Sequence, residues 1–295
     1  AIVALIAVPA FAEVQNVKVS GDIDSKMIAR NNYNLGSGVA GNGSDDTDKW
    51  FMSTARVQID ADLTDNVSTC VRLLNERDWN QEAVADGSGN TNVALDLASV
   101  KMKEMFYAPL TLTIGRQNLK FGSGLVVGDP DTNDASAGTS IEAEDLSVRK
   151  AFDAVRATLD YNPLVVDLFM AVINPGIIGS GNTNNDENLY GVNAAYKFNQ
   201  YNSEAEAYII SNRARSTTTK TITTDVYGVR GSLEPISKLI LNGEFAIQRG
   251  VFSATQDRSA WAADAAASYA IDYKWSPKVG VGYAYRSGDK AGNTG

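Results

Sequence analysis

The feature that most constrains this chain is a strict alternation between two kinds of connection. From residue 17 onward, segments of about ten residues alternate apolar and polar side chains, which is the period of a strand with one apolar and one polar face. The connections between them alternate between short turns and long polar loops. Short turns lie near Thr64, Ala108, Asn162, Asn199, Glu234 and Ser276, and long loops begin near Asn31, Asn75, Lys120, Asn174, Ser211 and Gly250. All long connections therefore fall at one end of an antiparallel, up-and-down meander.

Thirteen strands are predicted, over residues 17–26, 50–62, 67–73, 98–103, 110–114, 155–161, 166–172, 190–198, 205–209, 227–233, 239–247, 261–273 and 279–285. Aromatic residues gather at strand ends beside the short turns, namely Phe106, Tyr107, Tyr161, Phe198, Tyr201, Tyr273 and Trp275. Short turns, long outer loops and aromatic girdles are typical of a transmembrane β-barrel. A sheet in lipid closes on itself because no backbone group can stay unpaired. The predicted fold is an all-β, transmembrane up-and-down antiparallel β-barrel.

The first twelve residues differ from the rest. Residues 1–12 are apolar and end in Ala10-Phe11-Ala12, a small-x-small cleavage site, so they are expected to be the remnant of a secretory signal peptide. Residues 13–295 are expected to form the outer-membrane barrel of a Gram-negative-type bacterium. Bacterial single-chain barrels have an even number of strands. With thirteen strands and a final segment that resembles an outer loop, the barrel is expected to be C-terminally incomplete.

The composition of the chain excludes several classes of catalytic and binding site. The chain has no histidine and one cysteine, Cys70, which excludes Ser-His-Asp and Cys-His catalysis and histidine metal sites within this sequence. The formal net charge of −9 argues against a nucleic-acid partner. Acidic loop residues such as Asp129, Asp131 and Asp134 lack the full EF-hand spacing and are expected to be solvated. We expect no enzyme activity, no cofactor and no metal site.

One stretch carries a resemblance to a known family. Gly115-Arg116-Gln117, Leu119, Phe121-Gly122 and Leu125-Val126-Val127-Gly128 resemble the Gly-Arg-Gln-x-Leu-x-(aromatic or apolar)-Gly signature of the alginate-export outer-membrane porins. Gly124 stands where that family commonly has an arginine. The resemblance implies a complete barrel of about eighteen strands, whose basic lumen passes an anionic polyuronate and whose long loops gate the pore.

The same resemblance implies roles for two residues and a loop. Arg116 and Gln117 would belong to a constriction, and the loop after Lys120 would be a gate or constriction loop. The residues themselves leave the facing of Arg116 open, because Arg116 shares parity with the apolar Leu112 and Ile114. A bulge at Gly115 would be needed to turn it inward.

The polar face carries basic residues that are candidates for pore lining. They are Arg56, Arg72, Lys101, Lys103, Arg156, Lys197, Arg230 and Arg286, with Lys26 and Arg30. Rings of basic side chains select anions, and arginine binds carboxylates with two parallel hydrogen bonds. Acidic residues on the same face indicate either a transverse field or pairing with the arginines. Selective anion passage and a generic charged lining therefore both remain open.

We predict an outer-membrane channel for an anionic polysaccharide, alginate-like, or its fragments. The alternative is a general or small-anion diffusion porin. An enzymatic barrel such as a phospholipase would need a histidine, and a structural barrel would have its lumen blocked by paired charges. The expected partners are outer-membrane lipid and lipopolysaccharide, anionic polysaccharide or small anions, and a periplasmic export apparatus.

Overall fold

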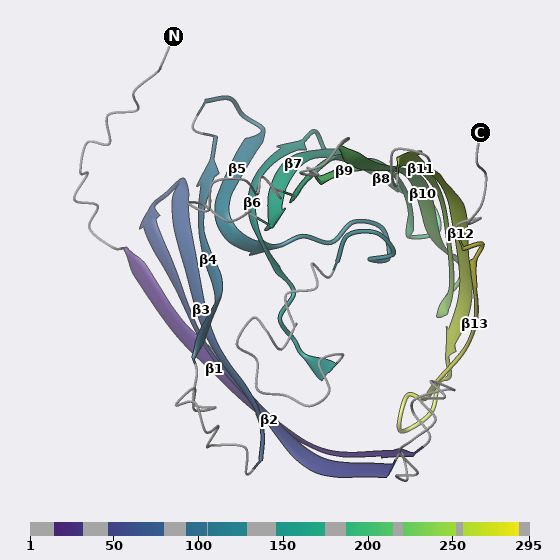
Figure 1. The fold of residues 1–295 in the computed structure, drawn as a ribbon, viewed down its shortest axis with the longest axis horizontal. Coiled ribbons are helices and arrows are strands. Elements are labelled where there is room, and N and C mark those ends of the chain that lie inside the picture. Colours follow the sequence, from purple (N-terminus) through teal and green to yellow (C-terminus); the bar gives the residue numbers. More distant parts are fainter. Residues whose placement is uncertain are drawn as a thin grey trace. The chain divides into compact units, whose positions relative to one another are not determined.

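The computed structural model describes residues 15–31, 47–79, 93–104, 106–128, 146–174, 187–214, 221–251 and 256–288. In these ranges the chain forms thirteen β-strands, whose order in the sheet follows the sequence (Figure 1). No helix within the described ranges is long and apolar enough to cross a bilayer. The predicted all-β, up-and-down meander is confirmed. Residues 1–12, the expected signal-peptide remnant, lie outside the described ranges.

The strands divide between two compact units. The first unit comprises residues 1–102 and 133–149, and the second comprises residues 103–132 and 150–295. Strands of the first unit are β1 (Asn16–Asn31), β2 (Thr47–Thr64), β3 (Val67–Asp78) and β4 (Ala94–Lys103). Strands of the second unit are β5 (Leu110–Asn118), β6 (Ala151–Asp160), β7 (Leu164–Asn174), β8 (Glu187–Phe198), β9 (Ser203–Ala214), β10 (Ile222–Ile236), β11 (Leu239–Val251), β12 (Asp257–Ala270) and β13 (Lys278–Arg286).

Several predicted strand boundaries were wrong. β3 continues to Asp78, where a polar loop was expected from Asn75, and β9 continues to Ala214, where a loop was expected from Ser211. Near the short turns, β12 stops at Ala270, so Tyr273 lies in the turn and not in the strand that was predicted to reach it. Backbone hydrogen bonds between strands do not depend on side-chain polarity, so these strands continue through polar residues that hydropathy alone assigns to loops.

The register gives the sheet one apolar and one polar face. Across β5 to β8, Ile114 lies opposite Val155, Val155 opposite Met170, and Met170 opposite Tyr190. All four side chains are exposed. Opposed residues of an antiparallel ladder share a face, so these positions form a continuous exposed apolar row. Such a face, on strands whose other side is charged, is typical of lipid contact in outer-membrane barrels.

Aromatic side chains pack together near both ends of the strands. Near the short turns, Tyr196 and Phe198 lie 4.7 Å apart, centroid to centroid. Near the long loops, Phe51 stacks on Trp79 at 4.8 Å, and Trp261 stacks on Tyr285 at 4.5 Å. Amphipathic rings favour the membrane–water interface, so these pairs mark the two girdles predicted from sequence.

The second unit has its apolar core on the polar face of the sheet. It comprises Leu119, Phe121, Val127, Phe152, Ala154, Phe169, Ala171, Leu189, Tyr208, Ile210, Val226 and Ala246. Two of its rings lie over glycines of the neighbouring strands. A Cβ on Gly191 would overlap the Phe169 ring, and a Cβ on Gly228 would overlap the Tyr208 ring. The two glycines therefore give both rings room to lie against the sheet.

The facing of the strands yields a stability prediction. Val229 is the middle residue of β10 and is 55% exposed on the apolar face. We expect Val229→Arg to destabilise the folded state by about 2–4 kcal/mol, because the substitution places a charge in the hydrocarbon of the bilayer. The control is Ser232→Arg on the opposite face of the same strand, which should cost much less. Guanidinium unfolding in lipid vesicles, followed by tryptophan fluorescence, measures both. Equal costs would contradict the assignment of faces.

Candidate functional site

The segment after β5 folds back onto the polar face of the second unit. We call residues Leu119–Gly128 the wall loop. The Phe121 N–H donates to the Val127 carbonyl at 3.1 Å and closes the loop into a compact hairpin. Leu119, Phe121 and Val127 are each at most 3% exposed. The described start of the long excursion that was predicted as a constriction or gate is therefore packed against the sheet.

Gln117 supports the backbone where β5 ends. Its side-chain Nε2 lies 3.0 Å from the Ala154 carbonyl oxygen, 3.2 Å from that of Thr113 and 3.3 Å from that of Gly115. The residue is 6% exposed. Its amide is thus occupied by main-chain acceptors and fixes the point from which the wall loop leaves the sheet.

Two buried carboxylates hold the tip of the wall loop. The Gly122 N–H donates to Glu206 Oε1 at 2.7 Å, and the Ser123 N–H donates to Glu244 Oε2 at 2.8 Å. Tyr208 Oη donates to the other oxygen of Glu244 at 2.7 Å. Hydrogen bonds to an ionised acceptor are about twice as strong as neutral ones. The loop tip is therefore fixed to β9 and β11 by charge-assisted bonds.

The glycine after Phe121 is required by this geometry. Gly122 has φ of +62°, a conformation that side chains other than glycine rarely adopt. A Cβ there would also overlap the Glu244 carboxylate. The Phe-Gly part of the sequence signature is thus explained by the close approach of backbone and carboxylate.

Aromatic stacking fixes the side of the loop nearest β7. The rings of Phe121 and Phe169 are stacked 4.6 Å apart. The guanidinium of Arg156 lies 5.5 Å from the centroid of Phe121. Arg156 also forms two hydrogen bonds of 2.8 Å with the buried carboxylate of Asp167. The predicted pore-lining Arg156 therefore also supports the wall loop.

A third glutamate holds the other end of the excursion, within the first unit. Glu76 accepts hydrogen bonds from Ser147 Oγ and from the Val148 N–H, both at 2.7 Å. Glu76 was predicted to lie in a loop. The signal that would have placed it is parity, because Glu76 continues the two-residue period of Arg72 and Leu74.

Arg30, one of the six arginines predicted on the polar face, lies 5.4 Å from the centroid of the Trp50 ring. The other five are all ion-paired. Their partners are Asp22 for Arg56, Asp96 for Arg72, Asp167 for Arg156, Glu204 and Glu206 for Arg230, and Asp264 for Arg286, at 2.5–3.4 Å. The predicted lysines Lys101, Lys103 and Lys197 are exposed and form no ion pair with the described part of the chain. Of the two interpretations of the opposing acids, the geometry favours pairing.

Arg116 does not join this group. The ladder between β5 and β6 runs without a shift, with Ile114 opposite Val155 and Arg116 opposite Asp153. Arg116 therefore lies on the apolar face, and its Nη1 forms a 3.1 Å ion pair with Asp153. Gly115 has a positive φ, but the bulge that would have turned Arg116 inward is absent from this ladder. The resemblance alone could not decide this facing.

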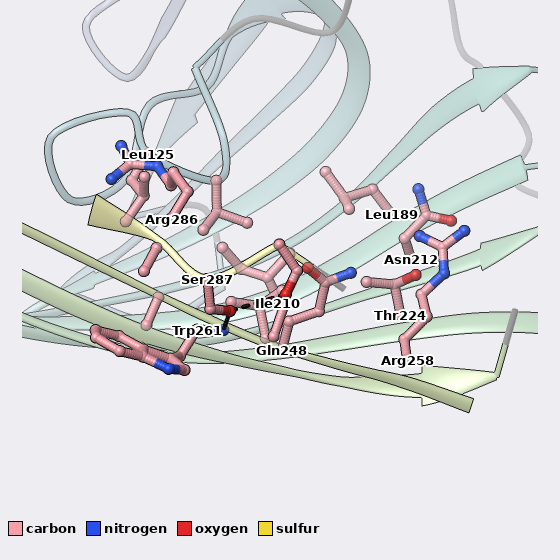
Figure 2. Close-up of a pocket in the computed structure, with 16 residues that line it drawn as sticks. Leu125, Leu189, Ile210, Asn212, Thr224, Gln248, Arg258, Trp261, Arg286 and Ser287 are labelled. Carbon is pink, nitrogen blue, oxygen red and sulfur yellow. Dashed lines mark hydrogen bonds between the residues drawn. The ribbon is translucent and has the colours of Figure 1, made fainter. Parts of the chain in front are cut away.

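A cavity of about 490 Å³ lies beside the wall loop on the polar face. Leu125 and Val126 of the loop, with Ile210 and other apolar residues, contribute apolar lining. Figure 2 shows Leu125, Leu189 and Ile210 among the lining side chains. Asn212, Thr224, Gln248, Arg258 and Arg286 add polar groups. None of the described residues that line the cavity is acidic. The cavity thus combines apolar surface, hydrogen-bonding groups and two guanidinium groups.

Sequence reasoning missed several of these residues. Asn212 and Arg258 were placed in loops, although both continue the polar parity of their strands. Asp96 was missed because a bulge between β3 and β4 shifts the register there. No group of three or more metal-ligating side chains is assembled in the described ranges. The acidic residues Asp129, Asp131 and Asp134 lie outside those ranges.

The role of Glu206 and Glu244 in holding the wall loop can be tested by substitution. We expect Glu206→Ala or Glu244→Ala to raise amide hydrogen exchange in residues 119–128 by roughly tenfold or more, because losing a charged acceptor costs about 1.5–3 kcal/mol. The matched control is Glu204→Ala, which removes a glutamate on the same strand and face that bonds Arg230 and not the loop. Equal exchange in all three variants would contradict the assignment.

Comparisons with known proteins agree with this architecture. The chain is similar to an anion-selective porin from Comamonas acidovorans, with a TM-score of 0.57, 13% identity, and coverage of 94% of this chain and 80% of that one. It is also similar to OprB of Pseudomonas putida, with a TM-score of 0.54, 12% identity, and coverage of 91% and 74%. At these identities the likeness shows the fold alone, which is that of outer-membrane porin β-barrels.

A comparison with curated proteins finds no significant match. The model of the alginate export family matches residues 22–295. The match covers both units and includes the signature stretch around Gly115 and Phe121. The chain therefore belongs to the alginate export family, as a β-barrel channel of the Gram-negative outer membrane.

Proposed function

We propose that this channel passes an anionic polysaccharide of the alginate type, or its fragments. The observation that carries the proposal is the cavity beside the wall loop, whose described lining is basic and free of carboxylates. This contrasts with a chain whose formal charge is −9 and whose polar face elsewhere pairs Arg56, Arg72, Arg156 and Arg230 with acidic side chains. The cavity is thus a locally anion-favouring site in the barrel wall.

The lining suits the chemistry of a uronate unit. A sugar ring presents an apolar face, hydroxyl groups and, in a uronate, one carboxylate. Leu125 and Val126 offer apolar surface, while Asn212, Thr224 and Gln248 offer partners for hydroxyl groups. The Arg258 guanidinium offers the planar fork that binds carboxylates. Each feature of the ligand therefore has a counterpart in the cavity.

The existing hydrogen bonds of the cavity favour weak binding of a passing ligand over tight binding. Asn212 already donates to Glu187 at 2.6 Å, and Arg286 is engaged with Asp264. These groups compete with a ligand and keep its binding weak. Conduction requires binding that is favourable enough for entry and weak enough for release. Passage of a long polymer would also require a periplasmic export apparatus.

A second candidate function is general or small-anion diffusion. The pairing of five of the six predicted polar-face arginines favours it, because a neutralised guanidinium contributes little net potential to the lumen. Under this alternative the exposed lysines Lys101, Lys103 and Lys197 would supply a modest preference for anions. The two candidates differ in whether a polymer interacts with the cavity.

Single-channel conductance of the full-length protein in planar bilayers distinguishes them. We expect polyuronate to block the channel and Arg258→Gln to weaken the block by about tenfold, since a hydrogen bond to a charged group contributes about 1.5–3 kcal/mol. The matched control is Arg116→Gln, which removes the same charge from the apolar face and should leave the block unchanged.

Three results would contradict the polymer channel. A neutral polysaccharide of equal length that blocks as well as polyuronate would remove the role of charge. An equal loss of block in the Arg116 and Arg258 variants would remove the role of the cavity. Weakly selective conductance that is indifferent to polyuronate would support the general porin.

A further inference from the structure

The wall loop carries a single charged residue, Lys120. Its side chain is exposed and forms no hydrogen bond or ion pair with the described part of the chain. Five of the arginines predicted on the polar face are instead paired with acidic side chains. Lys120 is therefore an unpaired cation on a segment that lies over the polar face of the second unit.

The aliphatic part of Lys120 lies across the backbone of its own loop. A Cβ on Gly124 would come within 3.1 Å of Lys120 Cε, and a Cβ on Gly128 would come within 3.7 Å of Lys120 Cγ. Gly124 has φ of +93°, a conformation that favours glycine, so the loop keeps this space free of another side chain. The packed stem restricts where the exposed ammonium group can lie.

Lys120 contributes to the lining of a second cavity of about 550 Å³, together with Ser123 and strands β10 to β13. Along β11 this cavity covers residues 242–244, whereas the cavity that contains Arg258 covers Ala246 and Gln248. Because β11 starts at a short turn, the Lys120 cavity lies nearer the short-turn end of the strands. A solute that moves along this face from one end to the other therefore meets both cavities.

Three of the four charged residues in the described lining are already engaged. These are Arg230, Glu244 and Asp264, and their partners are Glu204 and Glu206 for Arg230, Ser123 and Tyr208 for Glu244, and Arg286 for Asp264. Lys120 is the fourth, and it has no partner among the described residues. A paired charge is partly cancelled by its partner, so the free ammonium group acts most directly on a passing ion.

The balance of charge around the cavity gives this ammonium group its weight. The described lining holds two basic and two acidic residues, so it is neutral with Lys120 and acidic without it. Including the bonded neighbours Arg286, Glu204 and Glu206 makes the surroundings acidic in both cases. An acidic lining attracts cations. Lys120 is therefore the group that opposes the entry of cations at this point of the polar face.

We propose that Lys120 is a specificity-determining residue of the channel, whose ammonium group hinders cations and favours anions as they pass the wall loop. Charged side chains that line a pore select ions of the opposite sign. The inference does not depend on which anion passes. It applies equally to a channel for a polyuronate and to a porin for small anions.

Reversal potentials of the full-length protein in planar bilayers, measured across a KCl gradient, give the ratio of chloride to potassium permeability. We expect Lys120→Gln to lower this ratio about threefold, since a unit charge about 7 Å away acts oppositely on the two ions and is partly screened. Lys120→Glu changes the charge by two units and should lower the ratio about tenfold. Lys120→Arg keeps the charge and should keep the ratio.

Two other lysines serve as comparisons. Lys274 is exposed in the turn after β12 and is absent from the described lining of both cavities, so Lys274→Gln should leave the ratio unchanged. Lys197 is exposed on the polar face near the short-turn end of β8, where water and salt screen it, and Lys197→Gln should have a clearly smaller effect than Lys120→Gln.

Three results would overturn the proposal. The first is an unchanged ratio in both Lys120→Gln and Lys120→Glu. The second is an equal loss in Lys120→Gln and Lys197→Gln, which would assign the selectivity to the lining as a whole. The third is a loss in Lys120→Arg as large as that in Lys120→Gln, which would assign the effect to side-chain shape instead of charge.

Discussion

Every backbone amide that is taken out of water needs a partner, and this requirement organises both the sheet and the wall loop. In the strands the neighbouring strand supplies the partner, which is why consecutive strands pair along their length. Within the described ranges, no strand pairs with the tip of the wall loop. There the carboxylates of Glu206 and Glu244 accept the backbone N–H groups, and Glu76 does the same for Val148. Side-chain carboxylates thus take the place of a missing strand.

This use of carboxylates accounts for the charge pattern of the polar face. A buried carboxylate is costly unless it is hydrogen-bonded or paired. Glu206 satisfies the loop amide and also contacts Arg230, while Asp167 holds Arg156 beneath the Phe121 ring. Arg156 and Arg230 are therefore part of the framework that positions the loop. The cavity lined by Arg258 and Arg286 has no acidic residue in its described lining, although Arg286 is paired with Asp264 beyond that lining.

Sequence reasoning could predict the meander because strand period and connection length are local signals. It predicted which face carries Arg56, Arg230 and Arg286, but their partners depend on register between strands, which a single sequence does not specify. Arg116 shows the same limit, since its parity suggested the apolar face and only the β5–β6 ladder decides it. The cavity could not be predicted from the sequence, because it forms where a loop packs against residues about a hundred positions later in the chain. Asn212 and Arg258, read as loop residues, could have been recovered by extending the strand parity.

The two glycines covered by aromatic rings have a consequence for how the channel can vary. Gly191 leaves room for Phe169, which stacks on Phe121, and Gly228 leaves room for Tyr208, which hydrogen-bonds Glu244. Neither glycine appears among the hydrogen-bond or stacking partners of the wall loop in the described structure. Each glycine nevertheless sets the position of one aromatic ring, and that ring contacts the loop or a glutamate that holds it. The geometry of the wall loop can therefore be altered from two positions that do not bond or stack with it, by side-chain volume alone and without any change of charge.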